Sequence, residues 1–422
     1  MMNNLKVCII GLGYVGLPLA ALIAEKTNYK VFGFDIDEKR IEKLKKGESP
    51  IDHQFKKSTL KKITFSDHES ILEDSDFQII CVPTPVHHDN LPDFRPLISA
   101  TTTINKYLKK GQSIIIESTI NPGVCEELLL PLLTKLKVGE DFELAHCPER
   151  INPGDKLWHL ENIPRNIGAT TKKGCKKIAN FYRKFLSASI NEMSSIKAAE
   201  ASKIIENTFR DINIAYVNEL AKVFDLMEID LLEVINAAKN KPFAFMAHYP
   251  GCGVGGHCIP VDPYYLIENG RKIGFDHKFL KTAREINNSM PEYTVNLMET
   301  ILKKEKITKS QARIAILGLS YKGNISDYRE SPALEILKLL KKKKFAVESF
   351  DPLVPHLSTL KSLEEALQYA NCIIVASEHD QFKKIPTKLF KKNDIKIIID
   401  GKNCLNKNEI IKEKILYKGI GH

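Results

Sequence analysis

The sequence predicts an α/β fold in which two doubly wound parallel-sheet domains are joined by a long central helix and a small helical domain. Three observations predict it. The first and last thirds of the chain each alternate apolar runs of strand length with amphipathic stretches, these two thirds echo one another, and a long helical pattern without Gly or Pro lies between them. On this basis the 422 residues divide into domains 1–194, 195–305 and 306–422.

The first third supplies the strands of the first predicted sheet. Its apolar runs are residues 6–10, 31–34, 78–82 and 113–116. Because an amphipathic stretch separates each run from the next, the runs are expected to form a parallel sheet of βαβ units.

The last third repeats this arrangement, with strands expected at residues 313–317, 346–350, 372–376 and 396–399. The segment Gly11-Leu-Gly-Tyr-Val-Gly16 is echoed by Gly318-Leu-Ser-Tyr-Lys-Gly323, and Phe34-Asp35 is echoed by Phe350-Asp351. The echo predicts two nucleotide-binding domains of related, Rossmann-like construction.

Between them, a helix is expected from a cap at Ser194 or Ser195 to about Met227. Its apolar residues recur three or four positions apart, and a stripe of this length could pair with the same helix of a second subunit. A homodimer through this helix is therefore expected. Further helices are expected at residues 231–239 and 278–304.

Composition narrows the possible partners and the compartment. Lys+Arg 62 against Asp+Glu 52 gives a net charge of +10, but the lysines are scattered, so no nucleic-acid partner is expected. The uncharged run 7–24 is broken by glycines and Pro18, which favours a strand, turn and helix over a membrane span. Nine single cysteines favour free thiols, and a cytoplasmic protein is expected.

The first glycine-rich turn has the context of a dinucleotide site. It follows a strand, opens a helix and is followed by Asp35, 19 residues after Gly16. Backbone amides at the helix start can hold a pyrophosphate, while Asp35 can bind the ribose diol and repel a 2′-phosphate, so NAD is expected rather than NADP. Arg40 is expected to stack on the adenine. The alternative to a dinucleotide site is that the glycine-rich turn only lets the strand and the helix pack closely. The candidate cofactor contacts here are Gly11, Gly13, Tyr14, Val15, Gly16, Asp35 and Arg40.

The second turn differs at two positions. Ser320 replaces the middle glycine and Lys322 lies inside the turn, which suits an isolated diphosphate better than a dinucleotide. This domain could hold the nucleotide part of a substrate. The alternative is a decayed repeat with Lys322 in solvent.

The segment 250–263 is the most specific in the chain. Its four glycines in six positions bring backbone close to a ligand, and Cys258 stands where its thiolate could act as a nucleophile, with Asp262 four residues on. A buried packing role for Cys258 is one alternative. Metal ligation by Cys252, His257 and Cys258 is disfavoured because no fourth ligand lies at finger spacing, and no metal is expected.

Polar residues recur on the long helix and at strand ends. Glu200, Lys203, Asn207 and Arg210 share one helical face, which either lines a cleft or is merely solvated. Ligands bind at the carboxyl ends of parallel strands, so the loops after two strands are expected to contribute contacts. These are Pro83 and Thr84, the run Glu117-Ser118-Thr119, and the pair Glu149-Arg150 near a further turn.

Taken together, these motifs resemble the UDP-glucose/GDP-mannose dehydrogenase family over residues 5 to about 405. They are GLGYVG, VPTP, ESTINPG, PERINPGD, Lys203-xxx-Asn207, GVGGHCIPVDP and YKGNISDYRESP, in that order. The resemblance implies oxidation of the 6-hydroxymethyl group of a nucleotide sugar to a carboxylate with two NAD and a covalent thioester, for surface polysaccharide precursors.

The resemblance also implies residue roles. Cys258 would be the nucleophile, Lys203 and Asn207 would stabilise the oxyanion, and Asp262 would orient water or Lys203. Glu149 would be the general base with Thr119 beside it. The remaining implied cofactor contacts are Pro83, Thr84, Thr119 and Arg329, and the implied substrate contacts are Glu149, Arg150, Lys203, Asn207, Arg210, Tyr249, Gly255 and Lys322.

One position departs from the UDP-glucose branch. That branch carries a second glutamate four residues after the one matching Glu149, and this chain has Pro153 there. PERINPGD, together with Arg210 in NTFRDINIA, instead resembles the branch acting on UDP-N-acetylhexosamines, and UDP-N-acetylglucosamine is the expected substrate. UDP-N-acetylgalactosamine, UDP-N-acetylmannosamine and UDP-glucose are alternatives. Another is a nucleotide-binding regulator with a dead site, although the intact Cys258 and Lys203 argue against it.

Overall fold

The computed structural model describes residues 5–51, 55–86, 91–151 and 157–422 and divides into two compact units. The first unit comprises the described residues up to Glu206 together with Tyr264–Phe275. The second comprises Asn207–Pro263 and Asp276–His422. Pro153 lies outside the described residues.

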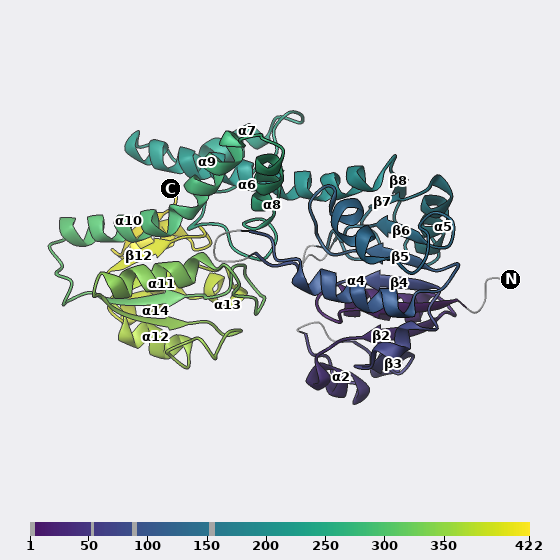
Figure 1. Ribbon diagram of the computed structural model, residues 1–422. Coiled ribbons are helices and arrows are strands. Elements are labelled where there is room, and N and C mark those ends of the chain that lie inside the picture. Colours follow the sequence, from purple (N-terminus) through teal and green to yellow (C-terminus); the bar gives the residue numbers. More distant parts are fainter. Residues whose placement is uncertain (1–4, 52–54, 87–90, 152–156) are drawn as a thin grey trace. The chain divides into compact units, whose positions relative to one another are not determined.

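An eight-stranded sheet forms the centre of the first unit, in the order β3-β2-β1-β4-β5-β6-β7-β8 (Figure 1). All neighbours are parallel except β6 and β7, which run antiparallel. The chain passes from one side of β1 to the other between β3 and β4, which creates the switch point where such sheets bind ligands. The strands are β1 (Lys6–Ile10), β2 (Lys30–Phe34), β3 (Ile63–Ser66), β4 (Phe77–Ile80), β5 (Ser113–Ile116), β6 (Glu143–His146), β7 (Arg165–Ala169) and β8 (Ile190–Glu192).

Helices cover both faces of this sheet, which explains why its central strands β1, β4 and β5 are mostly apolar and buried. Val7 and Ile9 of β1 pack in one cluster, whereas Cys8 and Ile10 pack in another on the opposite face. The helices are α1 (Gly16–Lys26), α2 (Glu38–Lys45), α3 (Lys57–Leu60), α4 (Arg95–Tyr107) and α5 (Lys172–Tyr182), with short helical turns at Glu69–Leu72, Cys125–Leu129 and Leu130–Leu132.

The second unit contains a five-stranded parallel sheet in the order β10-β9-β11-β12-β13. Its strands are β9 (Arg313–Leu317), β10 (Ala346–Phe350), β11 (Cys372–Val375), β12 (Ile397–Asp400) and β13 (Leu416–Gly419). Its sheet-covering helices are α10 (Met290–Lys304), α11 (Pro332–Lys342), α12 (Leu363–Tyr369), α13 (Asp380–Lys383), α14 (Thr387–Lys392) and α15 (Lys407–Lys412). The prediction of two doubly wound parallel-sheet domains is confirmed.

The long predicted helix is α6 (Ile196–Leu226), and the boundary between the two units falls within it, after Glu206. The hydroxyl oxygen of Ser195 accepts a hydrogen bond from the backbone N–H of Ala198 at 3.1 Å, so the expected cap is confirmed. Helix α7 (Leu231–Lys239) follows as expected, and α8 (Asp262–Lys272) comes after the glycine-rich loop.

One helix prediction is wrong. Residues 278–304 form two helices, α9 (Lys278–Asn288) and α10, rather than one. Pro291 stands in the first turn of α10, where the N–H that it lacks would have no intrahelical partner, and it therefore starts a new helix. In the described ranges, no helix is long and apolar enough to cross a membrane.

Candidate active site

The first glycine-rich turn has a shape that only glycine permits at two positions. Gly11 has φ of +91°, and an added Cβ would come within 2.9 Å of the Cys81 carbonyl oxygen. A Cβ on Gly16 would lie 1.9 Å from the carbonyl oxygen of Gly11. At Gly13 a Cβ would meet nothing within 4 Å, so this glycine leaves open space beside the turn.

The start of α1 fits a pyrophosphate. Among the described residues, no side chain caps the N-terminus of α1, whose N-cap residue is Val15, so the Gly16 N–H donates to no capping side chain. The Leu17 N–H donates to the Gly13 carbonyl oxygen at 3.2 Å, and Pro18 has no N–H. A helix N-terminus without a side-chain cap, beside an open glycine, can bind an anionic pyrophosphate. These residues would hold NAD, which accepts a hydride when bound.

Asp35 lies beside this turn at the end of β2 and is 6% exposed. Its carboxylate accepts hydrogen bonds from the backbone N–H groups of Leu12 at 2.8 Å and Asp37 at 3.0 Å. The guanidinium of Arg40 donates to the same carboxylate at 2.9 Å. Arg40 is therefore held by Asp35 in this structure, and its stacking on adenine stays a prediction.

The two strand-end loops predicted to contact the cofactor are tied together within the first unit. The hydroxyl of Thr84 donates to the Thr119 carbonyl oxygen at 2.8 Å, and the phenol of Tyr265 donates to the Thr84 carbonyl oxygen. Pro83 is exposed and Thr119 is half-buried, so both loops keep a surface that a ligand could reach.

Glu149, the predicted base, is buried in the first unit and accepts a hydrogen bond from the backbone N–H of Ile151. The Arg165 guanidinium lies 3.8 Å from its carboxylate. The neighbouring Arg150 forms a two-pronged ion pair with Glu206, at 2.7 and 3.0 Å. The predicted substrate contact at Arg150 would therefore have to share this guanidinium with Glu206.

The polar face of α6 is buried, which rules out the merely solvated alternative. Glu200 has a structural role, because its carboxylate accepts hydrogen bonds from the backbone N–H groups of Gly123 and Cys125. Lys203 is 7% exposed, and its ammonium group has no hydrogen-bond or ion-pair partner among the described residues. A buried cation without such a partner can stabilise an anionic oxygen.

In the second unit, Asn207 connects two other predicted residues. Its amide nitrogen donates to the Asp262 carboxylate at 2.5 Å, and its amide oxygen accepts from Arg210. Asn207 and Asp262 are both almost completely buried, so the amide and the carboxylate fix each other's orientation.

Cys258 is half-buried and stands four residues before the start of α8. The backbone N–H of Asp262 donates to the Cys258 carbonyl oxygen at 2.8 Å, and this turn brings the two residues near each other. Cys252 of the same loop is buried, and its thiol donates to the Ala376 carbonyl oxygen at 3.7 Å, so it packs.

The cysteine loop packs against the second glycine-rich turn and against the segment that follows it. A Cβ on Gly255 would lie 2.6 Å from the Tyr321 side chain, and the backbone N–H of Gly256 donates to the Arg329 carbonyl oxygen at 2.9 Å. Arg329 pairs with Asp327 at 2.5 Å and approaches His257 at 3.1 Å. Its contact with NAD therefore stays a prediction.

The second turn is held by buried polar groups. Asp351, at the end of β10, accepts backbone N–H hydrogen bonds from Leu319 at 2.7 Å and Ser320 at 2.9 Å. His379 Nε2 lies 3.1 Å from the same carboxylate, and His379 Nδ1 accepts from the Asn324 backbone N–H at 2.9 Å. The Ser320 hydroxyl donates to the Lys322 carbonyl oxygen at 3.1 Å, so Lys322 lies in a fixed, half-buried loop.

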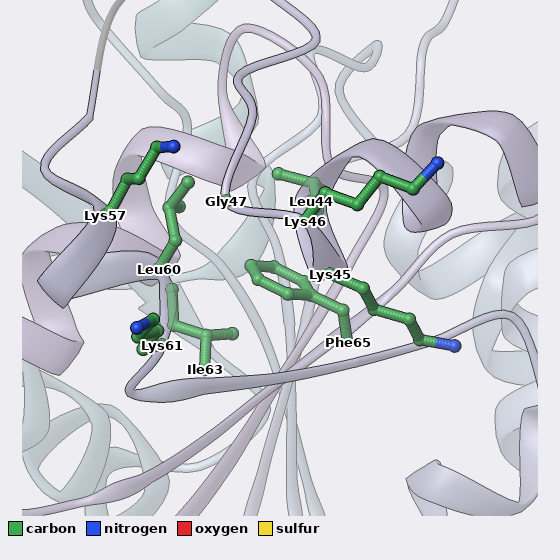
Figure 2. A pocket seen from close by; sticks show the side chains of 9 residues that line it. All are labelled: Leu44, Lys45, Lys46, Gly47, Lys57, Leu60, Lys61, Ile63 and Phe65. Atoms are coloured by element: carbon green, nitrogen blue, oxygen red, sulfur yellow. The ribbon is translucent and has the colours of Figure 1, made fainter.

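Tyr249, the remaining predicted substrate contact, is exposed, and its hydroxyl donates to the Asn236 side chain at 3.1 Å. Away from these residues, the first unit has a hollow of about 270 Å³ with an apolar floor. The ammonium groups of Lys45, Lys46 and Lys57 point away from that floor (Figure 2), so they do not converge on a ligand.

Sequence reasoning missed Arg165, Tyr182 and His379. Arg165 begins β7 and Tyr182 ends α5, and neither stands in a recognisable motif. His379 occupies the position that Thr84 has after the equivalent strand of the first sheet, a correspondence that the echo between the two halves could have indicated.

Family models match three successive parts of the chain. They describe the NAD-binding domain (residues 5–186), the central domain (197–289) and the UDP-binding domain (315–407) of one family. The chain belongs to the UDP-glucose/GDP-mannose dehydrogenase family. The predictions of NAD as cofactor and of an NAD-dependent nucleotide-sugar 6-dehydrogenase are confirmed at the level of this family.

Similar proteins are named for different nucleotide sugars. The chain is 38% identical to a UDP-N-acetyl-D-mannosamine dehydrogenase of Pyrococcus horikoshii, over 99% of both chains. It is also 38% identical to a UDP-N-acetyl-D-glucosamine 6-dehydrogenase of Pseudomonas aeruginosa, over 93% of this chain and 94% of the relative. The solved structure of the UDP-D-ManNAc dehydrogenase from Pyrococcus horikoshii has a TM-score of 0.91 at 36% identity, over 99% of both chains.

Proposed function

We propose that this family member oxidises the 6-hydroxymethyl group of a UDP-N-acetylhexosamine to a carboxylate through a thioester on Cys258. UDP-N-acetylglucosamine is the expected substrate. UDP-N-acetylmannosamine is the second candidate, because relatives named for the two sugars are equally identical to this chain. The observation that carries the proposal is the half-buried Cys258, whose carbonyl oxygen accepts from the backbone N–H of Asp262, the residue that pairs with Asn207.

The proposed steps balance over two oxidations. The hydroxymethyl group would lose a hydride to bound NAD and its hydroxyl proton to solvent, and the Cys258 thiolate would add to the resulting aldehyde, whose oxygen would take up a proton. The thiohemiacetal would then lose a hydride to a second NAD and its hydroxyl proton to solvent, which would leave a thioester. Glu149 removes a proton from water, the water oxygen attacks the thioester carbon and the carbon–sulfur bond breaks. Lys203 and Asn207 stabilise the oxyanion formed at each addition.

The ratio of NADH to sugar tests this scheme. The wild-type protein is expected to form two NADH per UDP-sugar, because the aldehyde stays on the protein until it is oxidised. In Cys258→Ser the poorer nucleophile should slow turnover by several orders of magnitude, and an acyl ester on the introduced hydroxyl should be visible by intact-protein mass spectrometry. Cys404→Ser, at the other half-buried cysteine, is the matched control and should retain the wild-type yield.

Two results would contradict the scheme. One is a yield of one NADH per sugar in the wild type, and the other is full four-electron oxidation by Cys258→Ala. No NADH formation with any UDP-sugar would favour the alternative of a nucleotide-binding regulator. A panel of UDP-N-acetylglucosamine, UDP-N-acetylgalactosamine, UDP-N-acetylmannosamine and UDP-glucose, compared by kcat/KM, identifies the substrate.

A homodimer through α6 is part of the proposal. Phe209, Tyr216 and Val223 stand seven residues apart on one face of this helix, and all three are exposed. Burying such a stripe against a second copy would remove it from water. Sedimentation at micromolar concentration should show a dimer that Tyr216→Glu weakens, and a monodisperse wild-type monomer would refute the dimer.

A further inference from the structure

We propose that Arg165 and Glu117 together set the basicity of Glu149, with Arg165 positioning the Glu149 carboxylate and Glu117 offsetting the charge of Arg165. The inference rests on the proposed role of Glu149 as the hydrolytic base. Both Arg165 and Glu117 are positioning residues, because each acts through Glu149 rather than on the substrate.

Arg165 is held in the interior of the first unit, between the ends of two strands. It begins β7 and is 1% exposed. One nitrogen of its guanidinium, Nη1, donates to the Pro148 carbonyl oxygen at 3.1 Å and lies 3.5 Å from the Glu117 carboxylate. The other terminal nitrogen, Nη2, lies 3.8 Å from Glu149, and among the described residues neither Nη2 nor Nε has a hydrogen-bond partner.

Arg165 interacts with two carboxylates, and its interaction with Glu117 is closer than its interaction with Glu149. The Glu117 side chain is completely buried, whereas that of Glu149 keeps some exposure. At 3.8 Å the pair with Glu149 is an ion pair without a hydrogen bond. The Arg165 guanidinium therefore holds the Glu149 carboxylate in place, while the negative charge of Glu117 offsets the positive charge that acts on Glu149.

Glu117 is held by a phenol on its far side. The Tyr182 hydroxyl donates to the Glu117 carboxylate at 2.5 Å, opposite the oxygen that faces Arg165. Burial raises the pKa of Glu117, which Arg165 and Tyr182 oppose. Burial disfavours the charge on Arg165, but Glu117 and Glu149 raise its pKa above the ordinary value, so it remains a cation.

Apart from Lys203, the other titratable groups named around this cluster are neutral near neutral pH. Burial raises the pKa of the thiols of Cys81 and Cys147 and of the Tyr182 phenol. Burial lowers the pKa of His146, at the end of β6, to about 3. The Lys203 ammonium interacts electrostatically with His146, and it is the cation that α6 adds to this region. Among the described residues, Glu149 forms its ion pair with Arg165, and Glu117 lies on the other side of that guanidinium.

Replacing Glu117 by Gln tests the inference. The variant removes the negative charge but keeps the shape, so the full charge of Arg165 acts on Glu149 and makes it a weaker base. The acidic limb of the kcat–pH profile should move to lower pH by about one unit, and the plateau rate should fall about tenfold. KM for NAD and for the UDP-sugar should stay within about twofold, a split that general loss of structure would not produce.

Two further variants keep the test decisive. Tyr182→Phe removes only the hydrogen-bond donor to Glu117, so a larger fraction of Glu117 is protonated. The acidic limb of the kcat–pH profile should again move to lower pH, by a smaller amount than in Glu117→Gln. If Glu117→Gln does not fold, Tyr182→Phe replaces it as the test. Glu126→Gln, at an exposed carboxylate of the same unit, is the matched control and should leave the profile unchanged.

The outcomes separate this inference from the proposed function. Glu149→Gln should abolish the acidic limb, and if it does not, the assignment of Glu149 as base fails and the inference fails with it. If Glu149→Gln behaves as expected but neither Glu117→Gln nor Tyr182→Phe moves the limb downward, only the inference is overturned.

Discussion

The two glycine-rich turns have the same backbone conformation at their first glycine, but the aspartate beside each turn makes different contacts. In both, the first glycine has φ near +90° and its N–H donates at 2.8 Å to the residue before an aspartate, Phe34 in one unit and Phe350 in the other. Asp35 retains 6% exposure and shares its carboxylate with an arginine side chain. Asp351 is 0% exposed and is engaged by four backbone N–H groups and a histidine.

The following helices differ as well. Helix α1 starts at Gly16, inside the first turn and without a side-chain cap. Helix α11 starts at Pro332, nine residues after Gly323, and is capped by Ser331, whose hydroxyl oxygen accepts from the Ala333 N–H. Both helices have a proline in the first turn, so the difference is the serine cap, which occupies a backbone donor at the start of α11. The two units therefore share a strand, a glycine-rich turn and an aspartate. They differ in the hydrogen bonds of that aspartate and in the capping of the following helix, and we expect these differences to select the ligand.

Removing Asp351 is expected to have the largest effect in this comparison. Asp351→Ala leaves several buried N–H groups and a histidine without an acceptor, which should lower the free energy of unfolding by about 3 kcal/mol or more. Asp35→Ala should lower it by only about 1 to 2 kcal/mol, because fewer donors depend on it. Chemical denaturation of both variants checks the difference, and equal losses would contradict it.

Replacing His379 is expected to have a smaller effect, which should change the KM for the UDP-sugar but not the KM for NAD. Because Nδ1 accepts a backbone N–H, Nε2 carries the proton and donates to Asp351 or Ser320. His379→Phe should raise KM for the UDP-sugar severalfold, since the loop carrying Lys322 loses its support, and leave KM for NAD unchanged. His379→Gln, which keeps a donor, should recover part of the loss, and parallel changes in both constants would refute this role.

Replacing Asp35 tests whether the first glycine-rich turn selects NAD over NADP. Asp35→Ala should weaken NAD and relieve repulsion of the NADP 2′-phosphate, shifting the preference tenfold to a hundredfold, about 1.4 to 3 kcal/mol. The measurement is kcat/KM for the two cofactors. The inference about Asp35 would be lost if their ratio did not change.

Gly13 should have the smallest effect on folding. A methyl group there meets no atom within 4 Å, so Gly13→Ala should change the free energy of unfolding by less than about 0.5 kcal/mol. Any loss should appear in NAD binding, measured by titration. Gly16→Ala is the contrasting variant, because its methyl would clash with the Gly11 carbonyl at 1.9 Å.

The sequence predicted these strands and turns because periodic burial and glycine spacing are local signals. It predicted α6 to within about one residue at either end, and the cap at Ser195, for the same reason. Strands β3, β6 to β8 and β13 were not predicted, because they are short and include polar residues, so they lack a clear apolar run. The Arg165–Glu117 pair was not predicted, because no local pattern connects two residues 48 positions apart. The break before α10 was missed although Pro291 signals it. Roles for Cys258 and Lys203 came from resemblance and stay predictions.

The burial of the thiols gives this protein a particular chemical vulnerability. All nine cysteines lie in the described ranges, and seven are buried, which leaves Cys258 and Cys404 within reach of reagents. Burial raises the pKa of Cys404, and Asp400 and Glu378 raise it further, so its reactive thiolate is scarce. An electrophile or peroxide would therefore react at Cys258 first, and a single alkylation or oxidation there would silence the proposed chemistry while the fold remained intact.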